Sequence, residues 1–284
     1  LSPDIYKAIL SAREILGGDV ALRSSANGED GKDISMAGVF ETFYVHKTDS
    51  EQQVIKKAKN LYRQAVSEDV KKYGIKAPKL EYIQNGVDLS EVDEQRQQPI
   101  DKDKNIKHVG FVGQMISRKN IFDLLDIFDA LQQKHGNLKL SLLGDGEQRA
   151  ELETYAQTLK SKNDIHFLGF RDDRLELLQS FDLFAMTSTL EGIPRCLMEA
   201  TAMGIPVAAY NIAGIDQLIE HGKTGLLAQL GDKATLTQYW ETILFDQSES
   251  ARLVMNARDY VQQHYSAKRM ADEYSSLFND MMKG

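Results

Sequence analysis

The sequence predicts an α/β fold, in which a parallel sheet is covered by helices on both faces and is preceded by a small α+β segment. From about Lys107 onward, short apolar runs alternate with segments whose apolar residues recur every three or four positions. Alternation of this kind is typical of strand–helix–strand units, which form parallel sheets. The length of 284 residues is enough for one large domain or two ordinary ones with buried cores.

The predicted elements follow one another in regular order. The run "HVGFVG" at 108–113 is typical of a buried strand. The apolar residues after it lie on one face of a helix: Ile121, Leu124, Leu125, Phe128 and Leu131. Further strands are predicted at 138–144, 164–170, 182–188, 205–211 and 224–229. Helices are predicted near 147–160 and 173–180, at 194–203, from about Gly214, and at 232–245, 248–264 and 267–282.

Composition excludes several classes of protein. The net charge of -8 argues against nucleic-acid polymers as partners, because phosphate backbones require a basic surface. The single cysteine, Cys196, excludes an internal disulfide framework and indicates a reducing, cytoplasmic environment. No apolar run approaches the roughly 20 residues that span a bilayer, and no signal peptide opens the chain. Peripheral contact with the inner face of a membrane is left open.

The stretch "EGIPRCLMEATAMGIP" at 191–206 predicts a helix that begins beside the end of a strand. Pro194 suits the first helical position, where its missing N–H costs nothing, and Gly204 suits the end of the helix. The first backbone N–H groups of such a helix are unsatisfied and attract phosphate without a metal ion. Here these are the N–H groups of Arg195, Cys196 and Leu197.

Two glutamates flank this helix start. Glu191 lies in the loop before the helix and Glu199 on its second turn, so both can face a ligand whose diphosphate lies between them. Carboxylates accept two neighbouring O–H groups well, which suits sugar hydroxyls and a ribose diol. The alternative is a solvated loop glutamate and a glutamate on the helix surface.

The spacing Glu191-x7-Glu199 resembles the E-x7-E signature of the retaining family 4 (group 1) glycosyltransferases of the GT-B fold. Other segments resemble the family's blocks in the same order: "NGVDL" (85–89), "FVGQMISRKN" (111–120), "LLGDGEQRAELE" (142–153), "IHFLGF" (165–170), "AMGIPVAA" (202–209) and "IEHGKTGLLA" (219–228). The resemblance covers about 66–284. It implies a Rossmann-like donor domain that moves a hexose-type sugar from a UDP- or GDP-sugar to a carbohydrate or lipid-linked acceptor, with retention and without a metal or other cofactor, in polysaccharide biosynthesis.

The resemblance also implies roles for individual residues. Glu191 would hold hydroxyls of the donor sugar, Glu199 the ribose, and Lys119 the diphosphate, where a cation stabilises the departing nucleotide. The other donor-binding positions would be Gly113 and Gln114 in the lysine segment, Ile193, Pro194, Arg195 and Cys196 at the helix start, and Gly169, Phe170 and Arg171 near the base. For Lys119 the alternative is an exposed lysine at the start of a helix.

Four residues depart from the family pattern. Gln114 stands where the family has arginine, so half of the expected diphosphate clamp is neutral. Asp216-Gln217 replaces a proline-glutamate pair, and Pro194 replaces the usual glycine. These departures are compatible with binding but bring catalytic strength into question. The pair Asp101 and Asp103 has the letters of a metal site, but its polar surroundings favour a solvated linker, and no metal site is predicted.

The first part of the chain carries a different pattern. The segment "DVALRSSANGEDGKDISMAGVFETFYVHKT" (19–48) resembles the ATP-binding domain of the phosphoenolpyruvate synthase and pyruvate phosphate dikinase family over about 5–64. The likeness implies that Arg23 meets ATP phosphates, a task suited to a guanidinium. The alternative is a small α+β piece that only packs. We therefore expect three parts: an ATP-grasp-like segment at 1–65, a linker with the end of an acceptor domain at 66–106, and the donor domain at 107–284.

Three functional hypotheses follow: a glycosyltransferase donor domain, which we favour, a non-catalytic nucleotide-sugar-binding module, and a phosphotransferase fragment that uses ATP. No complete acceptor domain is evident in the sequence. We therefore expect the chain to bind donor better than it transfers sugar, and to tend to self-associate through the last predicted helix. The base, the sugar, the acceptor and the oligomeric state do not follow from the sequence.

Overall fold

The computed structural model describes residues 20–22, 43–46 and 79–283, with side chains for 83–277. The chain divides into two compact units. One comprises Leu1–Gln84 and Ser276–Gly284, and the other comprises Asn85–Ser275. Arg23, the predicted ATP contact, lies outside the described residues.

The described part of the first unit is a three-stranded antiparallel sheet. It consists of β1 (Val20–Leu22), β2 (Phe43–His46) and β3 (Lys79–Tyr82), in the order β1-β2-β3. The pairing of Phe43 with Tyr82 joins β3 to β2. This ladder links residues 79–82 to the first segment, and the compact unit runs to Gln84. The domain boundary expected at residue 65 stays a prediction.

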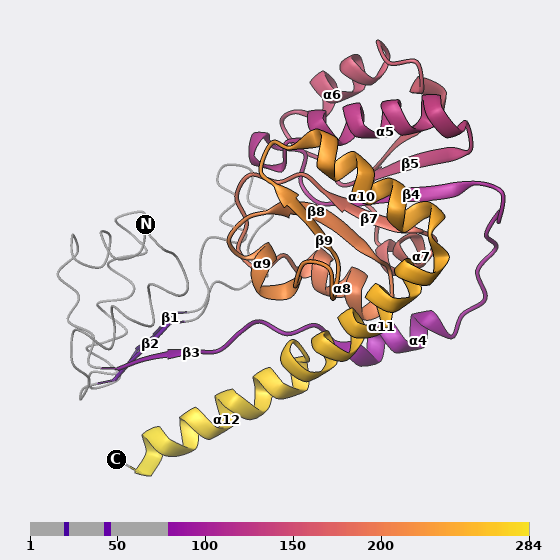
Figure 1. The fold of residues 1–284 in the computed structure, drawn as a ribbon. Coiled ribbons are helices and arrows are strands. Elements are labelled where there is room, and N and C mark those ends of the chain that lie inside the picture. Colours follow the sequence, from indigo (N-terminus) through magenta and orange to yellow (C-terminus); the bar gives the residue numbers. More distant parts are fainter. Residues whose placement is uncertain (1–19, 23–42, 47–78, 284) are drawn as a thin grey trace. The chain divides into compact units, whose positions relative to one another are not determined.

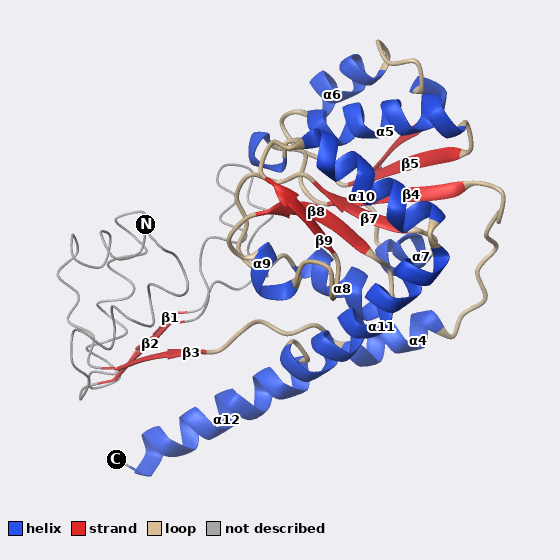
Figure 2. Ribbon diagram, viewed as in Figure 1, coloured by secondary structure: helices blue, strands red, loops and turns tan. Residues whose placement is uncertain are grey.

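The second unit contains the six-stranded parallel sheet that the sequence predicts, with helices on both sides (Figures 1 and 2). Its strands are β4 (Lys107–Val112), β5 (Leu138–Leu143), β6 (Ile165–Gly169), β7 (Leu183–Met186), β8 (Val207–Asn211) and β9 (Leu226–Gln229). The order is β6-β5-β4-β7-β8-β9, so the direction of strand succession reverses between β4 and β7. Ligands of such sheets bind at the carboxyl ends of the strands beside this reversal.

Two apolar cores cover the faces of the sheet. One contains α5 (Ile121–His135), α6 (Arg149–Ala156) and α10 (Lys233–Phe245), and the five residues predicted to share a face of α5 are all buried in it. The other contains α4 (Leu89–Arg96), α7 (Arg174–Gln179), α8 (Arg195–Met203), α9 (Ile215–Leu218) and the second half of α11 (Gln247–His264). Helix α12 spans Ala267–Lys283. Short 3-10 turns η2 (Ser117–Lys119) and η3 (Lys162–Asp164) complete the elements.

Two helices of the second unit are short, and one of them, α6, is shorter than the helix predicted near 147–160. Helix α6 ends at Ala156, and its chain continues in turns toward Leu159. Helix α9 is a single turn, because Ile219 adopts an extended conformation with φ -114° and ends it.

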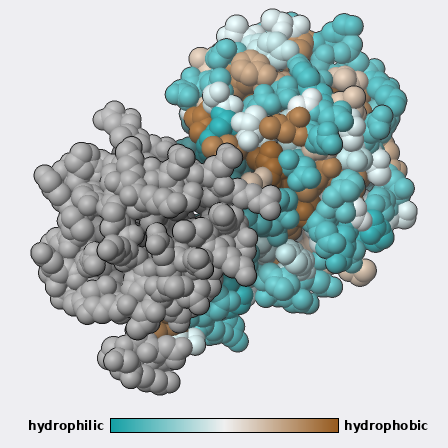
Figure 3. All heavy atoms as spheres, turned by 60° about the vertical axis from the view of Figure 1, so that its left-hand side comes forward, coloured by the Kyte–Doolittle hydropathy of each residue, from teal (hydrophilic) through white to brown (hydrophobic). Residues whose placement is uncertain are grey.

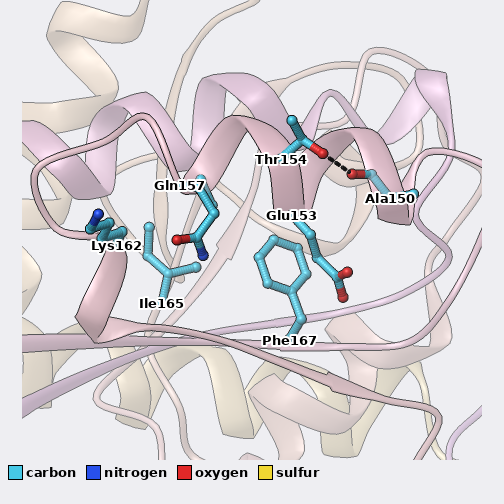
Figure 4. A pocket seen from close by; sticks show the side chains of 8 residues that line it. Ala150, Glu153, Thr154, Gln157, Lys162, Ile165 and Phe167 are labelled. Atoms are coloured by element: carbon cyan, nitrogen blue, oxygen red, sulfur yellow. Dashed lines mark hydrogen bonds between the residues drawn. The ribbon is translucent and has the colours of Figure 1, made fainter.

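The surface of the described residues is mixed in character. In Figure 3, hydrophilic residues cover most of the visible described surface, and apolar patches gather near its middle. None of the helices in the described part of the chain combines the length and apolar character that a bilayer crossing requires. An open hollow of about 560 Å³ lies along the edge strand β6, between it and α6 (Figure 4). None of the residues that line this hollow is a predicted site residue.

The start of β4 contains a buried histidine. The Nε2 atom of His108 lies 2.8 Å from the Ser141 hydroxyl, and its Nδ1 atom lies 3.0 Å from the Ser180 hydroxyl. Burial is the main cause that lowers the pKa of His108 from 6.5 to about 3. The imidazole is therefore neutral in the folded protein at all ordinary pH values.

We expect acid to destabilise the fold through His108. Between pH 6.5 and 3 the unfolded chain binds a proton that the folded chain does not, so the free energy of unfolding falls as pH falls. At pH 5 the His108 side chain lowers the free energy of unfolding by about 2 kcal/mol relative to neutral pH. Urea unfolding at pH 7 and pH 5 should show a smaller pH effect in His108→Leu than in the natural chain. The exposed-residue control His166→Leu should keep the full effect. An equal pH effect in His108→Leu and the natural chain would contradict the assignment.

Candidate active site

The candidate site lies at the carboxyl ends of the strands, where the loops after β4 and β7 are tied together. The hydroxyl of Thr187 donates to the carbonyl oxygens of Lys119 and Asn120 at 3.2 and 2.9 Å. The backbone N–H of Thr189 donates to the carbonyl of Arg118 at 2.8 Å. These bonds hold η2 against the loop that leads to Glu191.

Glu191 is held between two cations. Its Oε1 atom lies 2.5 Å from Nζ of Lys119, and its Oε2 atom lies 2.9 Å from Nη1 of Arg118. Glu191 and Lys119 are each only 6% exposed. The alternatives of a solvated glutamate and an exposed lysine are therefore wrong for this pair. Each charge needs the other, because an unpaired buried charge is strongly destabilising.

Glu199 is held in the same manner by two arginines. Its Oε1 atom accepts from Nη2 of Arg174 at 3.0 Å and from Nε of Arg195 at 2.9 Å. Glu199 is 3% exposed, so it is not a glutamate of the helix surface. The hydrogen bond to Glu199 raises the pKa of Arg174 above its usual value. Arg174 begins α7, which follows β6 and crosses to β7, and this path brings it to α8.

Four cationic side chains surround the two buried glutamates. They are those of Arg118, Lys119, Arg174 and Arg195, and the exposed carboxylate of Glu91 also lies 3.7 Å from Arg174. Neither Arg118 nor Arg174 was predicted to be a site residue. Arg118 could have been suspected from its place next to Lys119, whereas Arg174 lies in no motif.

The start of α8 differs from the prediction by one residue. Pro194 has φ -69° and ψ 127°, so it is the residue before the helix, which begins at Arg195. The fixed φ of proline suits both the first helical position and the position before it. The extended ψ shows that Pro194 occupies the position before the helix. The N–H of Leu197 donates to the Pro194 carbonyl at 3.1 Å and is not available to a ligand. Among the described residues, the N–H groups of Arg195 and Cys196 have no acceptor.

The segment that carries Lys119 is shaped by close backbone packing. The N–H of Gly113 donates to the Leu143 carbonyl at 2.9 Å, and a Cβ at Gly113 would lie 3.6 Å from Cε of Lys119. Gln114, the neutral replacement, follows directly and is half-buried. Asn120 follows the η2 turn and adopts a left-handed φ of 46°, a conformation that asparagine tolerates better than most residues.

The predicted base-binding residues end the edge strand β6. Gly169 adopts a φ of 68°, Phe170 is 80% exposed, and the guanidinium of Arg171 pairs with Asp173. Arg174, three positions after Arg171, is the residue of this loop that reaches Glu199. The loop after β6 and the helix α8 are thus joined at Glu199.

The remaining predicted residues of the helix start are buried or half-buried. Ile193 is 9% exposed and packs in the core beside α8. Burial raises the pKa of the Cys196 thiol to about 12, with nearby Lys119 opposing the shift. At neutral pH the thiol is protonated, so it does not act as a nucleophile.

Gly214 supports the Glu191 loop from the other side. It adopts a φ of 92°, and a Cβ there would lie 2.0 Å from the carbonyl oxygen of Gly192 and 2.7 Å from that of Glu191. The N–H of Gly214 donates to Oδ1 of Asp216 at 3.1 Å. Asp216, which replaces the family's proline, therefore stabilises this turn.

The geometry agrees with the comparison of the sequence with known families. Residues 92–260, more than half of the chain, match the family of glycosyl transferases group 1. The chain belongs to this family. Residues 1–81 match the AMP/ATP-binding domain of pyruvate phosphate dikinase, as the N-terminal resemblance implied.

Individual relatives agree with this membership. The chain is 28% identical over 145 residues to the N-acetyl-alpha-D-glucosaminyl L-malate synthase of Bacillus anthracis, covering 51% of this chain and 38% of that protein. It is 28% identical over 166 residues to the lipopolysaccharide core biosynthesis glycosyltransferase LpsE of Rhizobium meliloti, covering 58% of this chain and 48% of that protein. The chain thus spans less than half the length of these two relatives.

A solved structure shows the same fold. The crystal structure of HepE of Anabaena in complex with UDP and glucose superimposes with a TM-score of 0.64 at 27% identity. The match covers 76% of this chain and 61% of HepE. The predicted GT-B fold with a Rossmann-like sheet is therefore confirmed.

Proposed function

We propose that the unit Asn85–Ser275 binds a UDP-sugar and supports transfer of its hexose, with retention, to a carbohydrate or lipid-linked acceptor. The observation that carries the proposal is the pair of buried glutamates held by four cations at the carboxyl ends of the strands. The cluster of four cations suits a diphosphate, and the N–H groups of Arg195 and Cys196, which lack an acceptor among the described residues, add donors. The choice of UDP over GDP is supported by the likeness to HepE, whose structure holds UDP.

Each group of site residues would bind a different part of the UDP-sugar. Lys119 and the start of α8 would bind the diphosphate and stabilise the charge that develops as UDP departs. Glu191 would accept hydroxyls of the sugar while Lys119 and Arg118 hold its carboxylate in place. Glu199 would accept hydroxyls of the ribose. The exposed Phe170 and its neighbours after β6 would lie beside the base.

We expect UDP to bind without a divalent metal, since the cations of the site take the place that a metal would fill. Within the described residues, no three His, Cys, Asp or Glu side chains are grouped so as to hold a metal ion. Titration calorimetry with UDP should give the same affinity with EDTA and with Mg²⁺. A requirement for the metal would contradict this part of the proposal, and stabilisation by ATP alone would contradict UDP binding altogether.

The two glutamates should differ in the ligands they affect. Glu199→Ala should weaken UDP and UDP-glucose alike, because both carry the ribose. Glu191→Ala should lower the affinity for UDP-glucose by about ten- to a hundredfold, the range expected for a lost charged hydrogen bond. The affinity for UDP should stay nearly unchanged. Calorimetry with both ligands on both variants checks the assignment. Equal losses of both ligands in both variants would show that the glutamates are wrongly placed.

A non-catalytic nucleotide-sugar-binding module is the second candidate, and Gln114 favours it because one cation of the family's diphosphate clamp is absent. Transfer of radiolabelled sugar to a broad acceptor panel separates the two candidates. The expectation that the chain binds donor better than it transfers sugar stays a prediction. The expectations of cytoplasmic location, peripheral membrane contact and self-association also stay predictions.

A further inference from the structure

The two oxygens of Glu199 are unequally occupied. Oε1 accepts two short hydrogen bonds, from Arg174 at 3.0 Å and from Arg195 at 2.9 Å. Oε2 accepts one long bond, from Nε of Arg174 at 3.4 Å. A carboxylate oxygen has two lone pairs, so Oε1 is filled, and Oε2 keeps most of its capacity for a further donor.

The two arginines do not hold Glu199 in the same way. Arg195 lies one turn away on the same helix, and its side chain is 60% exposed. Arg174 comes from a different element, contacts both oxygens of the carboxylate, and has a side chain only 31% exposed. A planar guanidinium bound to two oxygens fixes the orientation of the carboxylate as well as its charge.

Arg174 also contacts a second carboxylate. Its Nη2 atom, which bonds Glu199, lies 3.7 Å from Oε2 of Glu91 on helix α4. The guanidinium therefore bridges α4 and α8 from the start of α7. Because it contacts both helices, it restricts the rotamers open to Glu199 before any ligand arrives.

We propose that Arg174 is a positioning residue for ribose recognition: it turns Glu199 so that Oε2 is presented to a ribose hydroxyl. The inference rests on the proposed function, in which Glu199 meets the ribose. Arg174 acts through Glu199 and not by contact with the nucleotide. The effect of Arg174 on nucleotide affinity must therefore depend on both the ribose hydroxyls and the Glu199 carboxylate.

The test measures the affinity of UDP and of 2′,3′-dideoxy-UDP by calorimetry for the natural chain, Arg174→Gln, Glu199→Ala and the double variant. We expect Arg174→Gln to weaken UDP about tenfold, the scale of one charge-assisted hydrogen bond, while the dideoxy analogue changes less than about twofold. In the Glu199→Ala background, Arg174→Gln should add no further loss. Arg174→Lys keeps the charge but cannot bind both oxygens. Its UDP affinity should therefore lie between that of Arg174→Gln and that of the natural chain.

Controls separate positioning from a general structural role. Arg96→Gln removes a positive charge from neighbouring α4, where Arg96 pairs with Asp93, and should leave both affinities unchanged. Thermal unfolding should show that the Arg174 variants are folded. If Arg174→Gln does not fold, the affinities of Arg174→Lys for UDP and for 2′,3′-dideoxy-UDP test the proposal in the same way.

The outcomes are distinguishable. Failure of the natural chain to bind UDP overturns the proposed function and this inference with it. Binding of UDP together with equal losses of UDP and the dideoxy analogue in Arg174→Gln overturns the inference alone. Additive losses in the double variant also overturn it, because Arg174 would then act independently of Glu199.

Discussion

Lys119→Met is expected to cause a large loss of both nucleotide affinity and stability. The substitution leaves the buried carboxylate of Glu191 with Arg118 as its one remaining cationic partner among the described residues. Breaking a buried pair from one side costs about 3–5 kcal/mol where no other partner remains, so we expect about 2–3 kcal/mol here. UDP affinity should fall about ten- to a hundredfold through loss of the diphosphate cation. Urea unfolding and calorimetry measure the two effects.

A double variant separates the two effects of Lys119. Lys119→Met combined with Glu191→Met replaces both charges by apolar groups, which is often neutral for stability. Stability should therefore return while UDP affinity stays low. Lys233→Met, a change to an exposed lysine paired with Asp126 at the start of α10, should alter stability by less than about 1 kcal/mol. Recovery of UDP affinity in the double variant would refute the role of Lys119 at the diphosphate.

Gly214→Ala is expected to displace the loop that carries Glu191. The new Cβ would lie 2.0 Å from the carbonyl oxygen of Gly192, and neither backbone segment can turn away as a flexible side chain could. Together with the positive φ of 92°, this predicts a loss of about 3 kcal/mol or more in the free energy of unfolding. Loss of UDP-glucose binding should accompany it, because the Glu191 carbonyl lies 2.7 Å from the same Cβ.

Gly231→Ala is the matched control. Gly231 has a similar φ of 83°, but nothing lies within 4 Å of its added Cβ. Its substitution should therefore cost only the backbone strain, about 1–2 kcal/mol, and leave ligand affinity unchanged. Equal effects of the two substitutions on stability and binding would mean that contact with the Glu191 loop is unimportant.

The strands of the second unit and the face of α5 were predictable because apolar periodicity reports burial directly. Ile121 and Leu125 are buried where the helical spacing placed them. The limits of α6 and α9 were not predictable to the same degree. They depend on turns such as the extended Ile219, which leave no apolar pattern.

The site likewise contains residues that motifs predict and contacts that only the tertiary structure reveals. Motif resemblance predicted Lys119 and Glu191 as site residues, but not their ion pair. The pair forms because both residues lie just after strands that are neighbours in the sheet. The contact of Arg174 with Glu199 depends on where the crossover from β6 to β7 begins. That position is a property of the tertiary packing of α7 against α4 and α8, and no local pattern in "FRDDRLEL" encodes it.

The cluster of cations at the site lies in a chain whose formal net charge is -8. A dianionic donor should therefore be repelled by the protein at long range and attracted only near the ends of β4 and β7. Salt screens charges separated by more than about 8 Å far better than it screens partly buried pairs. The rate constant for association should thus respond little to ionic strength, or even rise with it, since salt removes the distant repulsion first. The opposite dependence is expected where a whole protein surface attracts its ligand.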